Sequence, residues 1–173
     1  IIVLDIDLTS HGHDLRSAEK NLQLYHQLSG RAGRTGKPAN VYFQTYNLKP
    51  DIIDQITNED PFKFLDKELE LRKKNNLPPY ERFISLILSS SDEKILDVEA
   101  IKLKKIILNS INEKILGPVD APIYRINQKY RNRLLIRSKK SSKIQKKLKF
   151  ILKEFNLPKG IKLTVDVDPI SFN

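Results

Sequence analysis

Apolar positions in the first part of the chain form two short runs with a helical pattern between them. Ile1–Leu4 and Val41–Thr45 are rich in β-branched and aromatic residues, so each is predicted to be a strand. Between them, apolar residues recur every three to four positions up to Leu28, and Asp14 or Ser17 can cap the helix that this spacing predicts. The order strand, helix, strand is typical of the end of an α/β layer. We therefore predict that residues 1–46 belong to a larger α/β domain and that the chain is a piece of a longer protein.

The middle of the chain has helical spacing that stops at a pair of prolines. Helices are predicted over residues 51–58 and 61–75. Neither Pro78 nor Pro79 has a backbone N–H, and both restrict the residue before them, so a helix cannot continue through them. We therefore predict a helical connector over residues 47–80 and a separate domain over residues 81–173.

The last part of the chain alternates strand-like runs with two amphipathic helices. The expected elements are a strand over 83–89, a helix capped by Asp92, a turn at Gly117 and Pro118, an extended segment over 123–126, a strand over 134–136, a helix capped by Ser141 or Ser142, and a strand over 161–167. The order βαββαβ usually gives an antiparallel sheet with both helices on one face. We therefore predict a small α+β domain of the S10 or ferredoxin-like type.

Composition narrows the class of protein. Hydrophobic residues make up 39% of the chain and charged residues 30%, which is typical of a globular protein. No apolar run approaches the ~20 residues of a membrane span, so no membrane role is expected. With no cysteine the chain has neither a disulfide framework nor a thiolate zinc site. A reducing compartment suits this composition, and we predict a cytoplasmic protein.

The positive charge is concentrated in one region. The formal net charge is +10, and residues 125–160 hold thirteen Lys or Arg against one acid, Glu154. Such a concentration favours a polyanionic partner, either nucleic acid phosphate or an acidic protein tail. A solvated lysine-rich surface is the plain alternative.

The sharpest local motif is the segment from Gln27 to Arg34. It combines two arginines, Arg31 and Arg34, with the flexible backbone of Gly30 and Gly33 at a predicted helix end. A guanidinium can hold phosphate oxygens with two parallel hydrogen bonds and never loses its charge. The segment can therefore contribute to phosphoryl transfer across a cleft. A basic loop in a turn is the simpler alternative.

This segment resembles motif VI of superfamily 2 helicases, Q-x-x-G-R-x-G-R, at all five specified positions. Nearly the whole chain is similar to the C-terminal part of the primosomal protein N′ (PriA) family of replication-restart helicases. The other matching segments are 4–7 with 14–19 (motif V), 41–46, Glu68 with Arg72 and 77–80, 116–118, 130–135 and 165–169. The resemblance implies that residues 1–46 are the end of a RecA-like helicase lobe.

The resemblance also implies an ATP-dependent DNA helicase that moves 3′ to 5′, recognises stalled forks and restarts replication by assembling a primosome. Gln27, Arg31 and Arg34 are then expected to contact the γ-phosphate of ATP, whose Mg²⁺ the missing part of the site would hold. Residues implied to couple nucleotide state to DNA are Asp5, Asp14, Gly30 and Gly33. The family's zinc is bound by cysteines upstream, so none is expected in this cysteine-free chain. Neither a phosphate-binding loop nor an acidic Mg²⁺ motif is present, and we expect the isolated chain to hydrolyse no ATP.

The basic region of the last domain supplies two further candidate surfaces. For DNA, especially forked or junction DNA, the candidates are Lys129, Tyr130, Arg131, Arg133 and Arg137. Where the family usually has a second aromatic residue this chain has Asn132, so weaker base stacking is expected. The family also docks the acidic tail of single-stranded-DNA-binding protein, and the candidates for that contact are Lys139, Lys140, Lys143 and Gln145. Other primosome proteins are expected partners too.

Several acidic and histidine residues are predicted to be structural. Asp166 and Asp168 point to one face of a strand, but with no accompanying ligand they are expected to pair with basic residues. His11 and His13 flank Gly12 in a predicted loop, and no metal site is expected. Two alternatives of another class stay open: an S10-like module that binds nucleic acid without ATPase coupling, or an adaptor for acidic tails.

Overall fold

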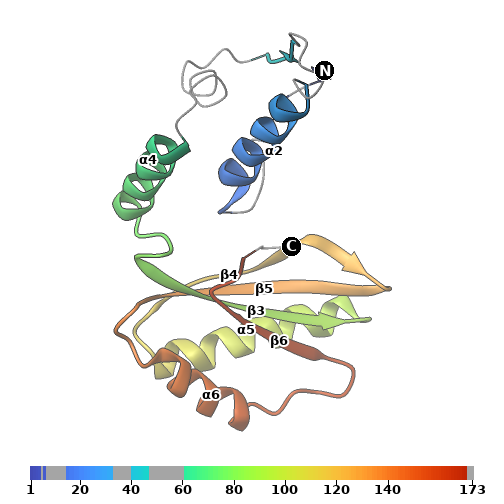
Figure 1. Cartoon of the computed structure of the whole chain (residues 1–173). Coiled ribbons are helices and arrows are strands. Elements are labelled where there is room, and N and C mark those ends of the chain that lie inside the picture. The colour runs from blue at the N-terminus through green and yellow to red at the C-terminus, as the bar shows by residue number, and fades with distance from the viewer. Residues whose placement is uncertain (5, 7–14, 33–39, 47–60, 171–173) are drawn as a thin grey trace. The chain divides into compact units, whose positions relative to one another are not determined.

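The computed structural model describes residues 1–4, 6, 15–32, 40–46 and 61–170. The chain forms two compact units, residues 1–71 and residues 72–173 (Figure 1). No helix within the described ranges has the length and apolar character that a bilayer span requires.

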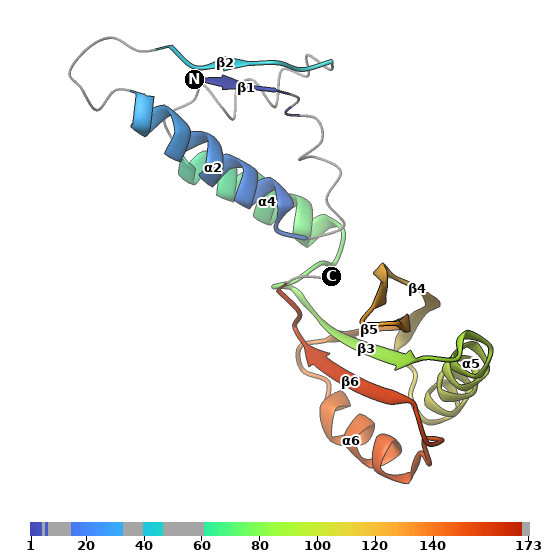
Figure 2. The ribbon, with the colours of Figure 1, turned by 90° about the vertical axis from the view of Figure 1, so that its right-hand side faces the viewer.

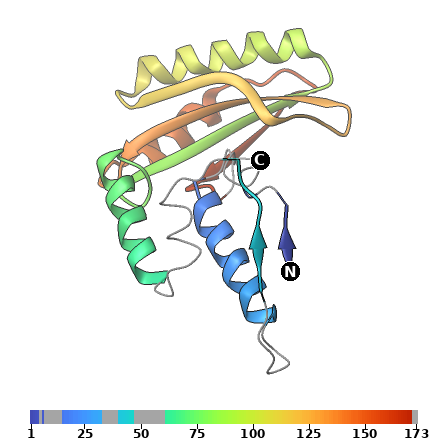
Figure 3. The ribbon, with the colours of Figure 1, turned by 90° about the horizontal axis from the view of Figure 1, so that it is seen from above.

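The first unit contains a parallel pair of strands joined through a helix. Strand β1 (Ile2–Val3) pairs with β2 (Tyr42–Phe43), helix α2 (Ser17–Ala32) lies between them in sequence, and Figure 3 shows both strands running in the same direction. Tyr25 of α2 is buried with its ring edge-on to Phe43, at 5.3 Å between centroids. The predicted order strand, helix, strand is therefore confirmed. The RecA-like assignment stays a prediction.

The connector contains one described helix. The helix predicted over 51–58 lies outside the described residues, and α4 (Pro61–Lys74) begins after them. Arg72 near the end of α4 is only 8% exposed and donates from Nη1 to the Pro78 carbonyl at 3.4 Å. The Leu77 N–H donates to the Arg72 carbonyl. These contacts fold the proline-containing turn back onto the end of the helix.

The second unit is an antiparallel sheet covered on one face by two helices (Figure 1). Its elements in chain order are β3 (Glu81–Ser90), α5 (Glu93–Ser110), β4 (Lys114–Ile126), β5 (Lys129–Lys139), α6 (Ile144–Glu154) and β6 (Lys162–Val167). The strand order is β4-β5-β3-β6, so β6 forms one edge beside β3 (Figure 2). The predicted order βαββαβ and the placement of both helices on one face are confirmed.

Period-two alternation in the strands decides which side chains form the core. Ile84 and Leu86 of β3 and Leu134 of β5 are fully buried and pack against both helices. From α5 and α6 the core receives one apolar stripe each, and the buried members are Leu96, Ala100, Leu103, Ile107, Ile144, Leu148 and Ile151. The alternate strand residues therefore point to the face that carries no helix.

Two predicted local features differ in the structure. Asp92 caps α5 as predicted, since its Oδ1 accepts from the Ile95 N–H at 3.1 Å. The prediction that Ser141 or Ser142 caps α6 is wrong: Lys143 occupies the cap position without a side-chain hydrogen bond. The Ser142 hydroxyl instead donates to Glu113 Oε1 at 2.7 Å. A serine at a helix start has competing partners, which sequence alone does not reveal.

Gly117 lies inside a strand, not at the start of a separate segment as predicted. Strand β4 continues through it with an irregular register between Leu116 and Val119. Gly117 has φ +91°, and a Cβ at this position would lie 2.5 Å from the Arg133 carbonyl oxygen. Glycine is required here because the neighbouring backbone of β5 comes too close for a side chain.

Candidate nucleic-acid interface

The helix-free face of the sheet carries a row of cations at one end. Arg131 of β5 pairs with Ser89 of β3, which pairs in turn with Lys162 of β6. Paired residues share a face, so Arg131 and Lys162 lie on the same side of the sheet with one strand between them. Alternation along β5 places Lys129 and Arg133 on this side too. We call Lys129, Arg131, Arg133 and Lys162 the cation row.

Electrostatics along this face change from one end to the other. Away from the cation row, Arg137 Nη2 lies 3.1 Å from Glu81 Oε2. The positive charge is therefore partly neutralised at that end. At the other end, the pKa of Arg133 is lowered by burial and then by repulsion from the nearby Arg131 charge. A phosphate placed beside these two arginines would relieve that repulsion.

Arg137 holds the sheet to the turn that follows α4. Besides Glu81, its guanidinium donates to the carbonyl oxygens of Asn75 and Asn76 at 3.1 and 2.8 Å. The group also lies 5.4 Å from the centre of the Phe83 ring. An ion pair and two carbonyl acceptors occupy the fork of the guanidinium, so we assign Arg137 to this junction and leave it out of the cation row. Arg131, which donates from Nη1 to the Ile123 carbonyl oxygen at 3.2 Å, stays in the row. Asp168 pairs with Arg82 and also accepts from the Phe83 N–H, in the structural role predicted for it.

The predicted DNA-binding segment 129–133 is divided between the two faces of the sheet. Tyr130 is half-buried on the helix side, where it packs against the core, whereas Arg131 and Arg133 point to the open side. Asn132 is 4% exposed on the helix side and donates from Nδ2 to Asp97 Oδ1 of α5. A residue at position 132 is therefore placed to join β5 to α5. The arginines of the segment therefore face the helix-free side, whereas Tyr130 and Asn132 face the helices.

A second tyrosine lies beside Tyr130, and the sequence analysis missed it. Tyr124 of β4 lies 5.4 Å from Tyr130 between ring centroids, and the Arg125 guanidinium lies 4.9 Å from the centre of the Tyr130 ring. The β4–β5 turn brings these groups together, because Asn127 and Gln128 both have positive φ, as a two-residue hairpin turn requires. The Tyr124 hydroxyl donates to Glu93 Oε1, which raises the pKa of Tyr124 to about 12.

Two side chains, Tyr124 and Lys162, were not predicted from the sequence, and the reasons differ. Tyr124 and Tyr130 become neighbours through the hairpin register, which starts from the pair Ile126 and Lys129, and a hairpin alignment of the sequence would have placed them close together. Lys162 is 31 residues beyond Arg131 and meets it only through β3. Its position requires the strand order of the sheet, which the local sequence does not contain.

The residues predicted to dock an acidic tail separate into two places. Lys139 lines an open cleft of about 770 Å³, together with Lys74, Lys114 and Lys147. Ser138 also lines this cleft, and its Oγ is buried without a hydrogen-bond partner. Gln145 lines a different, smaller pocket with Leu148 and Val167. Lys140 and Lys143 are exposed in the segment that joins β5 to α6.

Part of the predicted nucleotide-contacting segment is described. Gln27, Gly30 and Arg31 are exposed in the C-terminal half of α2. Gln27 lines a pocket of about 510 Å³ with Leu22 and Phe64. The remaining predicted residues, Asp5, Asp14, Gly33 and Arg34, lie outside the described residues, as do His11 and His13. Two donors at this helix end, the amide of Gln27 and the guanidinium of Arg31, have the chemistry that a phosphate requires.

No group of three or more His, Cys, Asp or Glu side chains that could hold a metal ion occurs among the described residues.

Comparison with known proteins gives one consistent result. The profile of the family described as Primosomal protein N C-terminal domain matches residues 73–170. The chain is 40% identical to replication restart protein PriA of Rickettsia conorii, 34% identical to that of Bacillus subtilis and 30% identical to that of Thermotoga maritima. These alignments cover 98%, 96% and 98% of this chain but 26%, 21% and 22% of the relatives. The chain thus spans about a quarter of the length of the curated relatives it matches.

Proposed function

The chain belongs to the PriA family, whose C-terminal domain it contains, and on that premise we propose that it binds DNA as part of a replication-restart helicase. In this role the cation row holds the phosphate backbone at a stalled fork while the rest of the protein supplies the motor. Such a protein acts in the cytoplasm, beside the chromosome.

The observation that carries the DNA-binding part is the cation row on the open sheet face. Four cationic side chains from β5 and β6 lie on one side of the sheet, and the acids that the described strand pairing places on that face, Glu81 and Asp166, lie towards its other end. A flat surface with spaced cations is suited to consecutive phosphates, which lie ~7 Å apart or less along a strand. Ser89 and Thr164, whose side chains share this face, can donate hydrogen bonds to the same backbone.

The hairpin provides groups of a second kind at the same end of the sheet. Arg125 covers one face of Tyr130, and Tyr124 lies beside it. A base or a strand end that reaches the hairpin can stack on an exposed guanidinium plane or on the Tyr124 ring. Phosphate contacts then fix the position of the DNA, and stacking selects an unpaired base at a junction.

For the motor we propose that Gln27, Arg31 and Arg34 contact the γ-phosphate of ATP across a cleft completed by the rest of the protein. The residues that couple this γ-phosphate contact to DNA binding are, in this proposal, Asp5, Asp14, Gly30 and Gly33. Mg²⁺ and ATP supply the phosphoryl chemistry when bound, and this chain supplies cationic donors that stabilise negative charge. The chain contains no cysteine, so the zinc of the family has no thiolate ligands here. The isolated chain is expected to hydrolyse no ATP, because its sequence has neither a phosphate-binding loop nor an acidic Mg²⁺ motif.

A second candidate function is docking of an acidic protein tail, such as that of single-stranded-DNA-binding protein. The cleft beside Lys139 supports it, because lysines from four different elements line the cleft and outnumber its two acids, Glu81 and Glu113. Another lining group, the Ser138 hydroxyl, is buried without a hydrogen-bond partner. A carboxylate in this cleft would accept hydrogen bonds from a lysine ammonium group and from the Ser138 hydroxyl. Lys140 and Lys143 are close in sequence and can extend the contact, whereas Gln145 faces another pocket.

The DNA-binding proposal is tested by titrating a labelled forked oligonucleotide with the chain and its variants. We expect Arg131→Gln combined with Lys162→Gln to weaken binding at least tenfold, because both phosphate contacts are lost. The matched control is Lys94→Gln with Lys105→Gln, which removes the same charge from exposed positions on α5. Equal weakening by both pairs would show that only net charge matters, and the assigned surface would be wrong.

The motor proposal is tested in the full-length protein. Arg34→Ala should lower DNA-stimulated ATP turnover by ~10³-fold while leaving fork affinity nearly unchanged, since the arginine acts on the transferred phosphate. Lys37→Ala, a nearby cation outside the motif, is the control and should retain turnover. ATP turnover that survives Arg34→Ala would refute the assigned role.

A further inference from the structure

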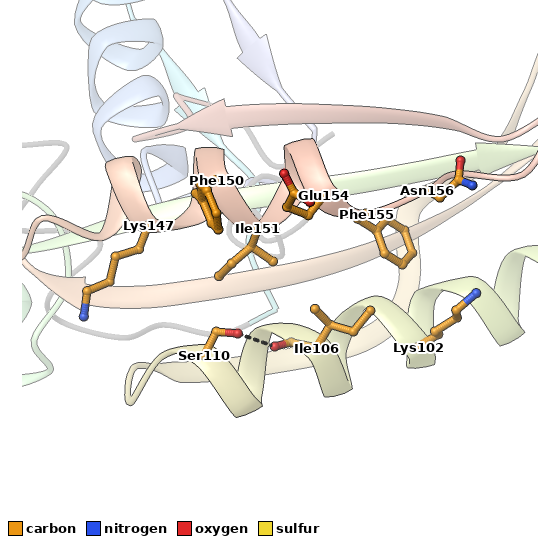
Figure 4. A pocket seen from close by; sticks show the side chains of 9 residues that line it. All are labelled: Lys102, Ile106, Ser110, Lys147, Phe150, Ile151, Glu154, Phe155 and Asn156. Atoms are coloured by element: carbon orange, nitrogen blue, oxygen red, sulfur yellow. Dashed lines mark hydrogen bonds between the residues drawn. The ribbon is translucent and has the colours of Figure 1, made fainter.

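The outer surface of the two helices contains an apolar groove that the DNA-binding proposal does not use. It lies between α5 and α6 and has a volume of about 670 Å³ (Figure 4). Ile106 of α5 faces Phe150 and Ile151 of α6 across it, and Phe155 closes one side. Phe150 is 68% exposed and Ile106 is 36% exposed. Large apolar side chains are thus left in water along a concave surface.

Lysines mark both ends of the groove. Figure 4 shows Lys147 and Ser110 at one end and Lys102 with Asn156 at the other. Lys102 Nζ lies 5.9 Å from the centre of the Phe155 ring, so its charge is held beside the apolar wall. The acid among the lining residues is Glu154. The neighbouring exposed surface of α6 is also positive, with Lys146, Lys149 and Lys153.

The dimensions of the groove suit a short helix. From Lys102 to Ser110 the wall formed by α5 is ~12 Å long at a rise of ~1.5 Å per residue, which corresponds to about two helical turns. A partner helix can place two apolar side chains, spaced by three or four residues, between Ile106 and Phe150. Acidic side chains at the flanking positions of the partner helix would then form ion pairs with Lys102 and Lys147.

We propose that the α5–α6 groove docks an acidic amphipathic helix of a protein partner. Nucleic acid offers phosphates but little apolar surface to cover Phe150, and a second copy of this chain carries the same positive charge, +10 overall. The groove lies on the helix layer, and the cation row lies on the opposite face of the sheet. This inference goes beyond the DNA-binding proposal, and the domain can hold DNA and a partner protein together.

The probe for this site is a synthetic, fluorescein-labelled helical peptide with leucine at positions i, i+3, i+4 and i+7 and glutamate at the other positions. We expect the intact chain to bind it and Phe150→Ser to weaken binding at least tenfold. Lys147→Glu should weaken it at least fivefold, and added salt should lower the affinity further. A scrambled peptide of the same composition should bind at least tenfold more weakly, because it lacks a continuous apolar stripe.

Matched variants on the same domain keep the result specific. Val98→Ser removes an apolar side chain that is 61% exposed on α5 but does not line the groove, and Lys105→Glu reverses a charge outside it. Both should bind the peptide as the parent chain does, and circular dichroism should be unchanged for all four variants. Equal binding of the peptide by Phe150→Ser and the parent chain would overturn the proposal.

Two further measurements distinguish other occupants. If Phe150→Ser weakens binding of a forked oligonucleotide, or abolishes self-association seen by sedimentation, the groove binds DNA or a second copy and the proposal is wrong. Stronger binding to vesicles of phosphatidylglycerol and phosphatidylcholine than to the peptide would also overturn it. Fork binding that is lost in the cation-row variant but unchanged in Phe150→Ser tests the DNA-binding proposal separately.

Discussion

The cation row makes a quantitative prediction about the salt dependence of DNA binding. Each phosphate that a cation neutralises on a duplex contributes about −0.9 to the slope of log affinity against log salt. With all four members in contact, Lys129, Arg131, Arg133 and Lys162, the expected slope is about −3.6. Raising the salt from about 50 mM to about 200 mM should then weaken binding about 150-fold.

Removing half of the row should halve this slope. For the double variant with Arg131→Gln and Lys162→Gln, the expected slope of log affinity against log salt is about −1.8. The same increase in salt should then weaken binding only about 12-fold. Fluorescence anisotropy of a labelled fork over a series of salt concentrations measures both slopes. If the slope of the variant equals that of the parent chain, or if Lys94→Gln with Lys105→Gln lowers it equally, the phosphates do not lie on this face.

Two further predictions concern the fold. Gly117→Ala should lower the free energy of unfolding by ~1–3 kcal/mol or more, because the new Cβ would lie 2.5 Å from the Arg133 carbonyl oxygen at φ +91°. Gly160→Ala, at the same φ but with open space around it, is the control, and urea unfolding that shifts equally for both would exclude the contact as the cause. The pKa of Tyr124 is raised to about 12, above the unfolded value near 10, so its stabilising effect is fully present below pH 10 and is lost as the pH rises through about 12. When the ionisation of the tyrosines is followed by tyrosinate absorbance, the component with the highest pKa should therefore be missing in Tyr124→Phe. An unchanged titration curve would show that the raised pKa does not belong to Tyr124.

Sequence periodicity was sufficient for the order of elements because each amphipathic stripe is local. The stripe of Leu96, Leu103 and Ile107 identified α5, and Asp92 marked its start correctly. The prediction for α6 failed at its cap, because Ser142 bonds to Glu113, a residue 29 positions away. Gly117 looked like a turn, yet its function is to let β4 approach β5. Long-range contacts decided both cases.

The candidate site was predictable only in part for the same reason. Arg131 and Arg133 could be identified from their place in a basic segment. The guanidinium of Arg137, in the same strand, instead binds Glu81 and two carbonyl oxygens of the turn after α4. Lys162 joins the row through a strand that pairs with β3. The groove partners Ile106 and Phe150 are 44 residues apart, and each looks like an ordinary exposed helix residue on its own.

The anchorage of Arg137 has a mechanical consequence. The same strand, β5, holds the turn after α4 at one end through Arg137 and carries Arg131 towards its other end. A pull applied at the turn of Asn75 and Asn76 therefore loads β5 directly through Arg137, in addition to β3, which follows the turn in the chain. Because β3 and β5 are antiparallel neighbours over ten residue pairs, the load is shared as shear across their whole ladder. A force that enters the domain at this turn is thus spread over two strands of the sheet instead of being carried by the first strand alone.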